Sequence, residues 1–182
     1  AGWSESSFSV ADGVILFGLS AVSKLGQPSV DQVVHARKAG PFLSLWDFLN
    51  RVDLRIVGRA VIENLIRAGA FDSISPNRRQ LMESLPAMFD LVQRRISDSR
   101  QQQLPGLDDV IEADGPVLVD SEDYDLHTRM EMEKEATGLY ISGHPFEQYE
   151  KSVSPYVTCT IPDLACWRSE NCPAVVAGIL VN

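Results

Sequence analysis

A short turn near the N-terminus carries residues that are suited to bind a phosphate group. Lys24-Leu25-Gly26 lies between a short helical segment and a second helix that opens with Pro28 and Ser29. In such a unit, the turn and the first residues of the second helix point free backbone N–H groups at one place, where the helix dipole also favours negative charge. A phosphate diester can bind there without any base being read. The candidate phosphate-binding residues of this turn are Lys24, Leu25, Gly26 and Ser29.

A second turn of the same kind is predicted between Val52 and Arg59, with Leu54 in the place of Leu25. Both turns depart from the usual order of glycine, apolar residue, glycine. Asp53 would stand where Lys24 stands in the first turn, and a carboxylate repels a phosphate but can cap a turn. The second turn is therefore either a second phosphate contact or a mainly structural element. Its candidate residues are Arg55, Val57, Gly58 and Arg59.

An internal repeat with a period of 29 residues surrounds these turns. Residues 39–45 align with residues 68–74, and further upstream Leu25 aligns with Leu54 and Val33 with Ile62. In each copy a glycine can end a helix in the left-handed conformation, a phenylalanine can fold back onto that helix, and a serine can cap the next one. Two such small units should pack together about a pseudo-twofold axis.

The remaining elements are mostly helical. Around Asp12-Gly13, a pair that can adopt positive φ angles, residues 7–17 predict a short β-hairpin, which should pack on the following helices or on a neighbouring domain. Helices are predicted from Pro28 to Gly40, over Leu45–Arg51 with Ser44 and Asp47 as a capping pair, from Val57 to Ala68, from Asn77 to Gln103 with a kink or a break at Pro86, and from Tyr124 to Ser142, followed by a strand over Ala174–Val181.

Charge is unevenly distributed along the chain. Residues 1–103 contain twelve Lys and Arg against ten Asp and Glu, whereas residues 104–182 contain four against fifteen. Any face that binds phosphate therefore belongs to the first part. No apolar run is long enough to cross a membrane and no signal peptide is evident, which predicts a cytoplasmic protein.

Other polar residues favour structural roles. Cys159, Cys166 and Cys172 are odd in number and are not spaced as a disulfide framework or a zinc site, so reduced thiols are expected. His144 is expected to bond to backbone in a turn, and the cluster of Glu131, Glu133, Lys134 and Glu135 to form a solvated helix face. The sequence offers no catalytic residue and no metal ligand set.

Several ordered strings resemble one family. They are residues 17–22 (FGLSAV), 40–48 (GPFLSLWDF), 65–72 (LIRAGAFD) and 133–145 (EKEATGLYISGHP). The first three lie in or beside the two repeated units described above, each of which has the helix-hairpin-helix pattern of a helix, a tight turn and a second helix. Together they resemble the alpha subunits of bacterial DNA polymerase III, the C-family polymerases, from the end of the fingers to the start of the OB domain. The resemblance implies a polymerase that uses magnesium held by palm-domain aspartates. Those aspartates lie upstream of the resembled region, so this chain by itself should not polymerise.

The resemblance also implies a peptide that docks on the beta sliding clamp, typically a glutamine followed by Leu or Met and a phenylalanine. The candidate lies within residues 101–107, where the phenylalanine is missing. In one alignment Gln101 is the first residue of the peptide and Pro105 stands where the phenylalanine is expected. In the other, Gln103 and Leu104 begin the peptide and Leu107 is its apolar anchor. A plain exposed linker is the other interpretation of this stretch.

The sequence thus predicts a mainly α protein with a short β-hairpin (1–18), a tandem helix-hairpin-helix bundle (19–103), an acidic linker (104–123), a connecting helix (124–152) and a partial OB segment (153–182). The expected function is sequence-independent binding of duplex DNA through its phosphates, and this binding should weaken as the salt concentration rises. The rest of the polymerase is the expected protein partner. The alternative is a scaffold that positions the OB domain and the clamp peptide and has little DNA affinity of its own.

Overall fold

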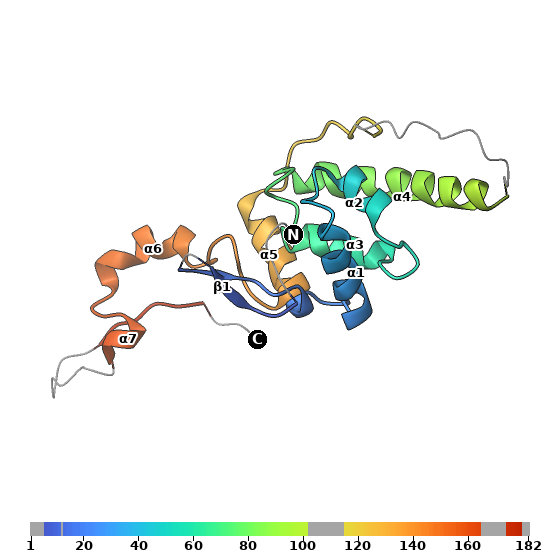
Figure 1. The fold of residues 1–182 in the computed structure, drawn as a ribbon. Coiled ribbons are helices and arrows are strands. Elements are labelled where there is room, and N and C mark those ends of the chain that lie inside the picture. Colours follow the sequence, from blue (N-terminus) through green and yellow to red (C-terminus); the bar gives the residue numbers. More distant parts are fainter. Residues whose placement is uncertain (1–5, 12, 102–114, 165–173, 180–182) are drawn as a thin grey trace.

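The computed structural model describes residues 6–11, 13–101, 115–164 and 174–179. The fold is mainly helical, as the sequence predicts. Figure 1 shows helices α1 to α5 gathered in one body, from which an arm, formed by the described residues after Pro145, extends to one side. The elements are β1 (Ser9–Ala11), β2 (Val14–Leu16), the 3-10 turn η1 (Leu19–Ala21), α1 (Gln27–Arg37), α2 (Leu45–Arg51), α3 (Arg59–Arg67), α4 (Arg78–Gln101), α5 (Leu126–Thr137), α6 (Glu147–Val153), η2 (Ser154–Tyr156) and α7 (Ile161–Leu164).

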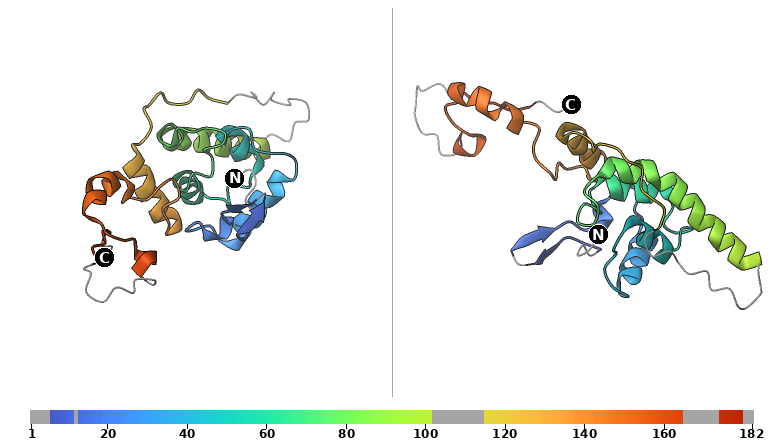
Figure 2. Two further views of the ribbon diagram at one scale, coloured as in Figure 1. Left: turned by 90° about the vertical axis from the view of Figure 1, so that its left-hand side faces the viewer. Right: turned by 90° about the horizontal axis from the view of Figure 1, so that it is seen from above.

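The predicted β-hairpin is present. Strands β1 and β2 pair antiparallel with Ser9 opposite Leu16, and Gly13 in the turn has φ +78°. The base of the ribbon is fixed to the body, because the Ser20 N–H donates to the Ser6 carbonyl at 3.0 Å. The ribbon itself projects from the helices (Figure 2), and Phe8 and Val10 are exposed. The following helices therefore cover its base and not its tip.

The repeated units share one aromatic centre. Phe42 and Phe71, which the repeat aligns, are both buried and both meet the ring of Phe48 edge-on, at centroid distances of 4.9 and 5.1 Å. Gly40 and Gly69, also aligned, both have positive φ, at +130° and +76°. The predicted repeat is confirmed at the C-terminal ends of α1 and α3, where the chain in both copies turns back onto the ring of Phe48.

The two copies differ in how the next helix begins. Ser44 Oγ accepts from the Asp47 N–H at 3.0 Å, so the predicted cap of α2 is confirmed. The aligned Ser73 does not cap α4, which begins five residues later and is capped by Asn77, whose Oδ1 accepts from the Gln80 N–H at 2.9 Å. The second copy therefore contains an extra turn before its next helix, and the predicted serine cap is wrong there.

An arginine closes the C-terminal end of each repeated helix. Arg51 donates to the carbonyls of Ala36 and Gly40 at 2.6 and 2.7 Å, at the end of α1. Arg78 donates to the carbonyl of Arg67, the last residue of α3, at 3.0 Å. The last carbonyls of a helix have no partner within it, and a cation there also favours the helix dipole. Both copies therefore meet the same need with a side chain from the following helix.

Helix α4 is continuous. Pro86 lies inside it, so the predicted break does not occur. Leu81, Leu85 and Met88 are buried on either side of the proline and face α2 and α3. Burial of this apolar stripe on both sides offsets the hydrogen bond that proline cannot donate.

The second part of the predicted exposed linker is docked on the body. Residues 115–125 run back along α4 (Figure 1), where the Val119 N–H donates to Ser84 Oγ at 2.9 Å and Asn77 Nδ2 donates to the Ser121 carbonyl at 2.6 Å. Gly115 lies so close to the Trp46 indole that a Cβ would overlap it. This part of the linker therefore packs on α4 while Val117 and Val119 stay exposed, and residues 102–114 lie outside the described residues.

Helix α5 ends earlier than predicted. Gly138, with φ +79°, terminates it after Thr137 and not at Ser142. The carboxylate of Glu133 then accepts from the N–H groups of Ile141 and Ser142 at 2.8 and 2.7 Å. Glu133 is completely buried, so the predicted solvated helix face is wrong at this residue. Those hydrogen bonds explain why the chain folds back after Gly138 instead of continuing as a helix.

A buried ion pair joins α4 to α5. Arg78 Nη2 lies 2.8 Å from Glu133 Oε1 and 2.7 Å from Asp72 Oδ2. Burial opposes the charged form of Glu133, but hydrogen bonds from Ser142, Arg78 and Ile141 hold the pKa of Glu133 below its ordinary value. The ion pair of Arg78 and Glu133 is therefore tolerated inside the body, because hydrogen bonds from neighbouring groups replace the water that both charges have lost.

The arm carries α6, η2 and α7. Residues 174–179 belong to no strand, and they touch the preceding segment where the Thr158 N–H donates to the Val175 carbonyl at 3.0 Å. The start of an OB domain over residues 153–182 stays a prediction. Among the described helices, none combines the length and apolar character that a membrane crossing requires.

Replacing Glu133 with Gln should destabilise the protein by about 3 kcal/mol, because it removes the fully buried one of the two carboxylates that neutralise Arg78, although Asp72 remains. Urea unfolding at pH 7 measures the loss. A folded-state pKa below the ordinary 4.5 means that Glu133 adds stability above that pH and loses it as the pH falls through the lowered pKa. The difference in free energy of unfolding between wild type and Glu133→Gln should therefore have its full size at pH 7 and be smaller at pH 3. The exposed Glu131→Gln is the control, and an equal effect of both variants would contradict the prediction.

Candidate nucleic-acid interface

The first hairpin, formed by η1, the turn at residues 22–26 and α1, presents an open helix N-terminus. The Leu25 N–H donates to the Val22 carbonyl at 3.1 Å, which closes the turn and buries Leu25. Gly26 caps α1 with an extended backbone, φ −67° and ψ 159°, and no side chain occupies the cap. The N–H groups of Gly26 and Gln27 donate to no described residue. They remain available to an anion.

Lys24 lies at the outer side of this turn. Its backbone has φ +64°, which lies in the left-handed region that residues other than glycine rarely adopt. The side chain is exposed and forms an ion pair with no described residue. The first turn therefore combines free N–H groups with an unneutralised positive charge.

The second hairpin, formed by α2, the turn at residues 53–58 and α3, has the same geometry in a different register. Gly58 caps α3 with φ −68° and ψ 164°, and the N–H groups of Val61 and Ile62 approach its carbonyl at 3.0 and 3.2 Å. Gly26 accepts in the same way from Ser29 and Val30 at 2.9 and 3.1 Å.

The buried residue before each capping glycine is Leu25 in one turn and Val57 in the other, 32 residues apart. The alignment of Leu25 with Leu54, and of Val33 with Ile62, is therefore wrong at the turns. The shift is three residues: α3 has nine residues against eleven in α1, and the turn that leads to Gly69 is one residue shorter than the turn that leads to Gly40. In this register the second turn reads Ile56-Val57-Gly58, so Ile56 takes the place of Lys24.

The charges of the second hairpin are paired internally. Asp53 Oδ1 accepts from the backbone N–H of Arg55 at 3.0 Å and from its Nε at 2.9 Å. Asp53 thus closes a local turn, as the sequence suggested. This hydrogen bond and the nearby carboxylate charge raise the pKa of Arg55. Arg59 forms an ion pair with Glu63 at 2.9 Å. Each arginine must therefore break its ion pair with a neighbouring carboxylate before it can bind a phosphate.

Two reciprocal hydrogen bonds hold the hairpins together. Ser29 Oγ, in the first turn of α1, donates to the Ile56 carbonyl of the second turn at 2.9 Å. Asn64 Nδ2, on α3, donates to the Ser23 carbonyl of the first turn at 2.8 Å. Each helix therefore holds the turn of the other copy, as two units related by a pseudo-twofold axis would. The N-terminus of α1 consequently lies beside the turn that leads into α3.

The predicted phosphate-binding residues divide into two groups. Lys24, Gly26, Arg55 and Arg59 are exposed and Gly58 is partly exposed, whereas Leu25, Ser29 and Val57 are buried. The buried three shape the turns and can contact a ligand only through their backbone. Sequence reasoning missed Asn64, whose signal is a polar residue within the buried stripe of Ile62, Leu65 and Ile66. Of the predicted clamp peptide, Gln101 is the last residue of α4, while Gln103, Leu104 and Leu107 lie outside the described residues.

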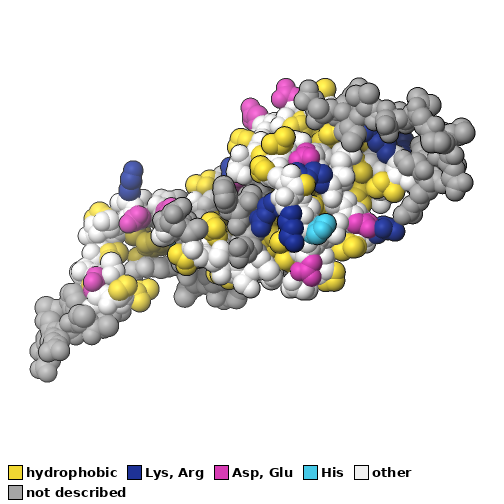
Figure 3. Space-filling view, viewed as in Figure 1, with side chains coloured by type: hydrophobic (Ala, Val, Ile, Leu, Met, Phe, Trp, Pro, Cys, Tyr) yellow, Lys and Arg dark blue, Asp and Glu magenta, His cyan; other side chains and the backbone are white. Residues whose placement is uncertain are grey.

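Basic side chains do not dominate the face of the body that Figure 3 shows. Lys and Arg gather near a histidine on this face, with acidic side chains among them. His35 and Asp31 are exposed on α1, and Lys38 is exposed at its C-cap. The electrostatic attraction of this face for a polyanion is therefore moderate.

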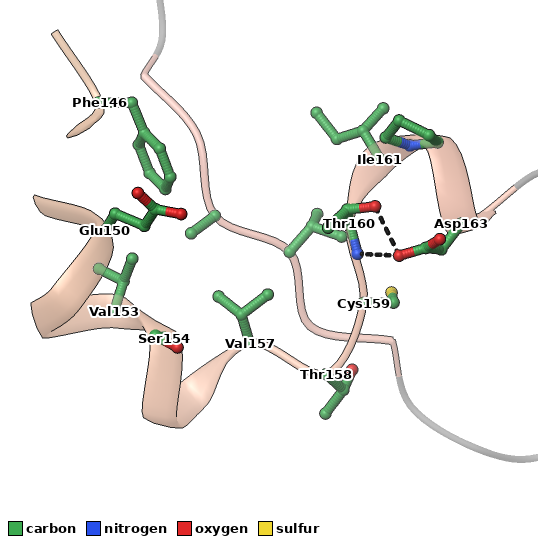
Figure 4. Close-up of a pocket in the computed structure, with 13 residues that line it drawn as sticks. Phe146, Glu150, Val153, Ser154, Val157, Thr158, Cys159, Thr160, Ile161 and Asp163 are labelled. Carbon is green, nitrogen blue, oxygen red and sulfur yellow. Dashed lines mark hydrogen bonds between the residues drawn. The ribbon is translucent and has the colours of Figure 1, made fainter. Parts of the chain in front are cut away.

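The arm contains a hollow of about 500 Å³ between α6 and α7 (Figure 4). Its walls are mainly apolar, and Asp163 is occupied by the N–H and hydroxyl of Thr160, at 2.9 and 2.5 Å. Cys159 is free and buried, and no histidine is present among the lining residues. Cys166 and Cys172 lie outside the described residues. His144 lies in a turn and accepts from the Phe146 N–H through Nδ1 at 3.2 Å, as predicted. No group of side chains that could hold a metal ion occurs in the described ranges.

Comparison with known proteins agrees with this geometry. The helix-hairpin-helix motif family matches residues 3–81. DNA polymerase III subunit alpha of Deinococcus radiodurans is 39% identical over 170 residues, which are 90% of this chain and 12% of that protein. The same subunit of Vibrio cholerae is 33% identical over 183 residues, 96% of this chain and 15% of that protein. That of Thermus aquaticus is 36% identical over 160 residues, 87% of this chain and 13% of that protein.

The chain thus spans between 12% and 15% of the length of these three relatives, while they match nearly all of it. The tandem hairpins and the fold-back after α5 lie within the 96% of this chain that the Vibrio cholerae subunit matches. The chain belongs to the family of DNA polymerase III alpha subunits and corresponds to a segment that contains their helix-hairpin-helix region.

Proposed function

We propose that residues 19–103 hold duplex DNA by its phosphates, without reading its sequence, and that the first hairpin makes the main contact. The observation that carries this proposal is the first turn, where the free N–H groups of Gly26 and Gln27 lie next to the unpaired Lys24. A phosphate oxygen can accept from both backbone groups while the ammonium neutralises its charge. These contacts suit the sugar-phosphate backbone, which is the same for every sequence.

The contribution of the second hairpin should be smaller. The N–H groups of Gly58 and Arg59 donate to no described residue and are equivalent to those of Gly26 and Gln27, but Ile56 replaces Lys24 and brings no charge. Arg55 and Arg59 can bind phosphate only by releasing Asp53 and Glu63. With a balance of only two positive charges over residues 1–103, the chain should bind DNA at about micromolar strength or more weakly at physiological salt.

This function is that of one segment in a larger enzyme. The full-length relatives are named DNA polymerase III subunit alpha, and we propose that this chain grips DNA within such a cytoplasmic polymerase while the reaction takes place elsewhere. The described residues include no cluster of carboxylates that could hold the magnesium ions of DNA synthesis. We propose that the chain alone does not extend a primer, because the palm-domain aspartates that the family resemblance implies lie upstream of the matched region.

A second candidate is a scaffold for the arm and for a clamp-binding peptide. The paired arginines of the second hairpin and the low net charge favour it. So does the docking of residues 115–125 along α4, which fixes the chain just beyond residues 101–107. If adding the beta sliding clamp shifts the chain in size exclusion chromatography, while duplex DNA causes no change in anisotropy at low salt, the scaffold function is supported and the DNA-binding proposal is contradicted.

Lys24→Glu should weaken binding to duplex DNA by about tenfold or more at ~50 mM salt, because it replaces an attraction with a repulsion at the main contact. The slope of log K against log salt should fall by about one, the loss of one phosphate contact. Fluorescence anisotropy with an unrelated pair of duplexes measures both quantities and tests sequence independence. Lys151→Glu on the exposed arm makes the same charge change away from the hairpins. Equal losses in the two variants would show that only net charge matters and would contradict a local site.

Asp53→Asn tests the second hairpin. The substitution removes a charge that repels phosphate and frees Arg55, so DNA binding should tighten by about two- to fivefold at low salt. Asp90→Asn, an exposed substitution on α4 with the same change in charge, is the matched control. If both variants bind DNA equally, the second hairpin makes no phosphate contact through Arg55.

A further inference from the structure

Ser23, the residue before Lys24, is held through both of its backbone groups by distant parts of the chain. Its N–H donates to the carbonyl of Ala136, near the end of α5, at 2.7 Å. Its carbonyl accepts from Asn64 Nδ2, on α3, at 2.8 Å. The first turn is therefore clamped between two helices that lie 41 and more than 100 residues further along the chain.

The clamp acts next to the least favourable backbone position in the first hairpin. Lys24 is the only non-glycine residue with positive φ among the described residues. A lysine adopts this conformation only when neighbouring contacts impose it. The two bonds at Ser23 fix the peptide groups on which that conformation depends. Asn64 is itself buried, so its amide has no water with which to exchange this bond.

The end of α5 is a rigid support for the clamp. Ala136 is fully buried, and its carbonyl is one of the last four of the helix, which have no partner within it. The Ser23 N–H supplies that partner. Beyond it, Gly138 ends the helix, and the Glu133 carboxylate holds the N–H groups of Ile141 and Ser142.

Resting on the DNA-binding function proposed above, we propose that Asn64 and the C-terminal end of α5 are positioning elements of the DNA contact. They grip Ser23 from both sides and thereby keep Lys24 and the free N–H groups of α1 directed at one phosphate. The functional unit then includes α5, which lies outside the segment 3–81 that matches the helix-hairpin-helix family. It follows that the chain around residues 138–145, which leads into the arm, is mechanically connected to the DNA contact.

The test compares Asn64→Ala with Asn50→Ala in the full chain. Asn50 Nδ2 also donates to a backbone carbonyl at 2.8 Å, that of Trp46, but within α2 and away from the first turn. Hydrogen exchange of the Ser23 and Leu25 amides, which donate to the Ala136 and Val22 carbonyls, reports the clamp directly in the free protein. DNA affinity is measured for both variants alone and in combination with Lys24→Ala.

Asn64→Ala should raise exchange in the first turn by about tenfold or more and weaken DNA binding about as much as Lys24→Ala does. In the Lys24→Ala background it should add little further loss, because both changes disable the same contact. Asn50→Ala should alter neither quantity. If Asn64→Ala lowers stability too far for these measurements, Asn64→Leu removes the donor at similar volume and adds no charge, and the same outcomes apply to it.

The possible results separate this inference from the function beneath it. Unchanged exchange in the first turn of Asn64→Ala, or losses of affinity that simply add to those of Lys24→Ala, would overturn the positioning role while leaving DNA binding intact. If Lys24→Ala itself leaves the affinity unchanged, the proposed contact is wrong, and the exchange data still decide whether Asn64 holds the turn.

Discussion

The body depends on one buried guanidinium. Arg78 is almost fully enclosed, and it contacts the last carbonyl of α3, the carboxylate of Asp72 and the carboxylate of Glu133. A charge in this position is tolerable only when each of its donors has a partner, and here the partners come from three successive parts of the fold. The ion pair links elements that lie far apart in the sequence. It brings α5 against α3 and so creates the support that the first turn requires.

Two copies of a simple unit have diverged in charge while keeping their shape. The backbone angles at Gly26 and Gly58 are nearly the same, and each helix still holds the other copy's turn. The difference lies in the side chains around the turns: an unpaired lysine in one, an isoleucine and two internally neutralised arginines in the other. Pseudosymmetry in this protein is therefore a property of packing, and the two turns differ in the charge that they expose.

Local signals made much of this fold predictable. The cap by Ser44, the glycines at 40 and 69 and the phenylalanines at 42 and 71 all lie where short-range chemistry dictates them, and the structure confirms each. The errors occur where contacts far apart in the sequence decide. Glu133 looks like any helical surface carboxylate until Arg78, 55 residues away, and the fold-back after Gly138 enclose it. The turn register failed because a fixed period cannot represent helices of unequal length.

Lys24 places stability and function in opposition. A glycine would adopt φ +64° without steric cost and would relieve the first turn of its strain, but it would bring no charge to the site. With the DNA contact proposed above, the native residue is a compromise in which folding free energy is given up for a binding contact. Stabilising substitutions at position 24 are consequently expected to be easy to find in a screen for thermal resistance and to weaken that proposed contact.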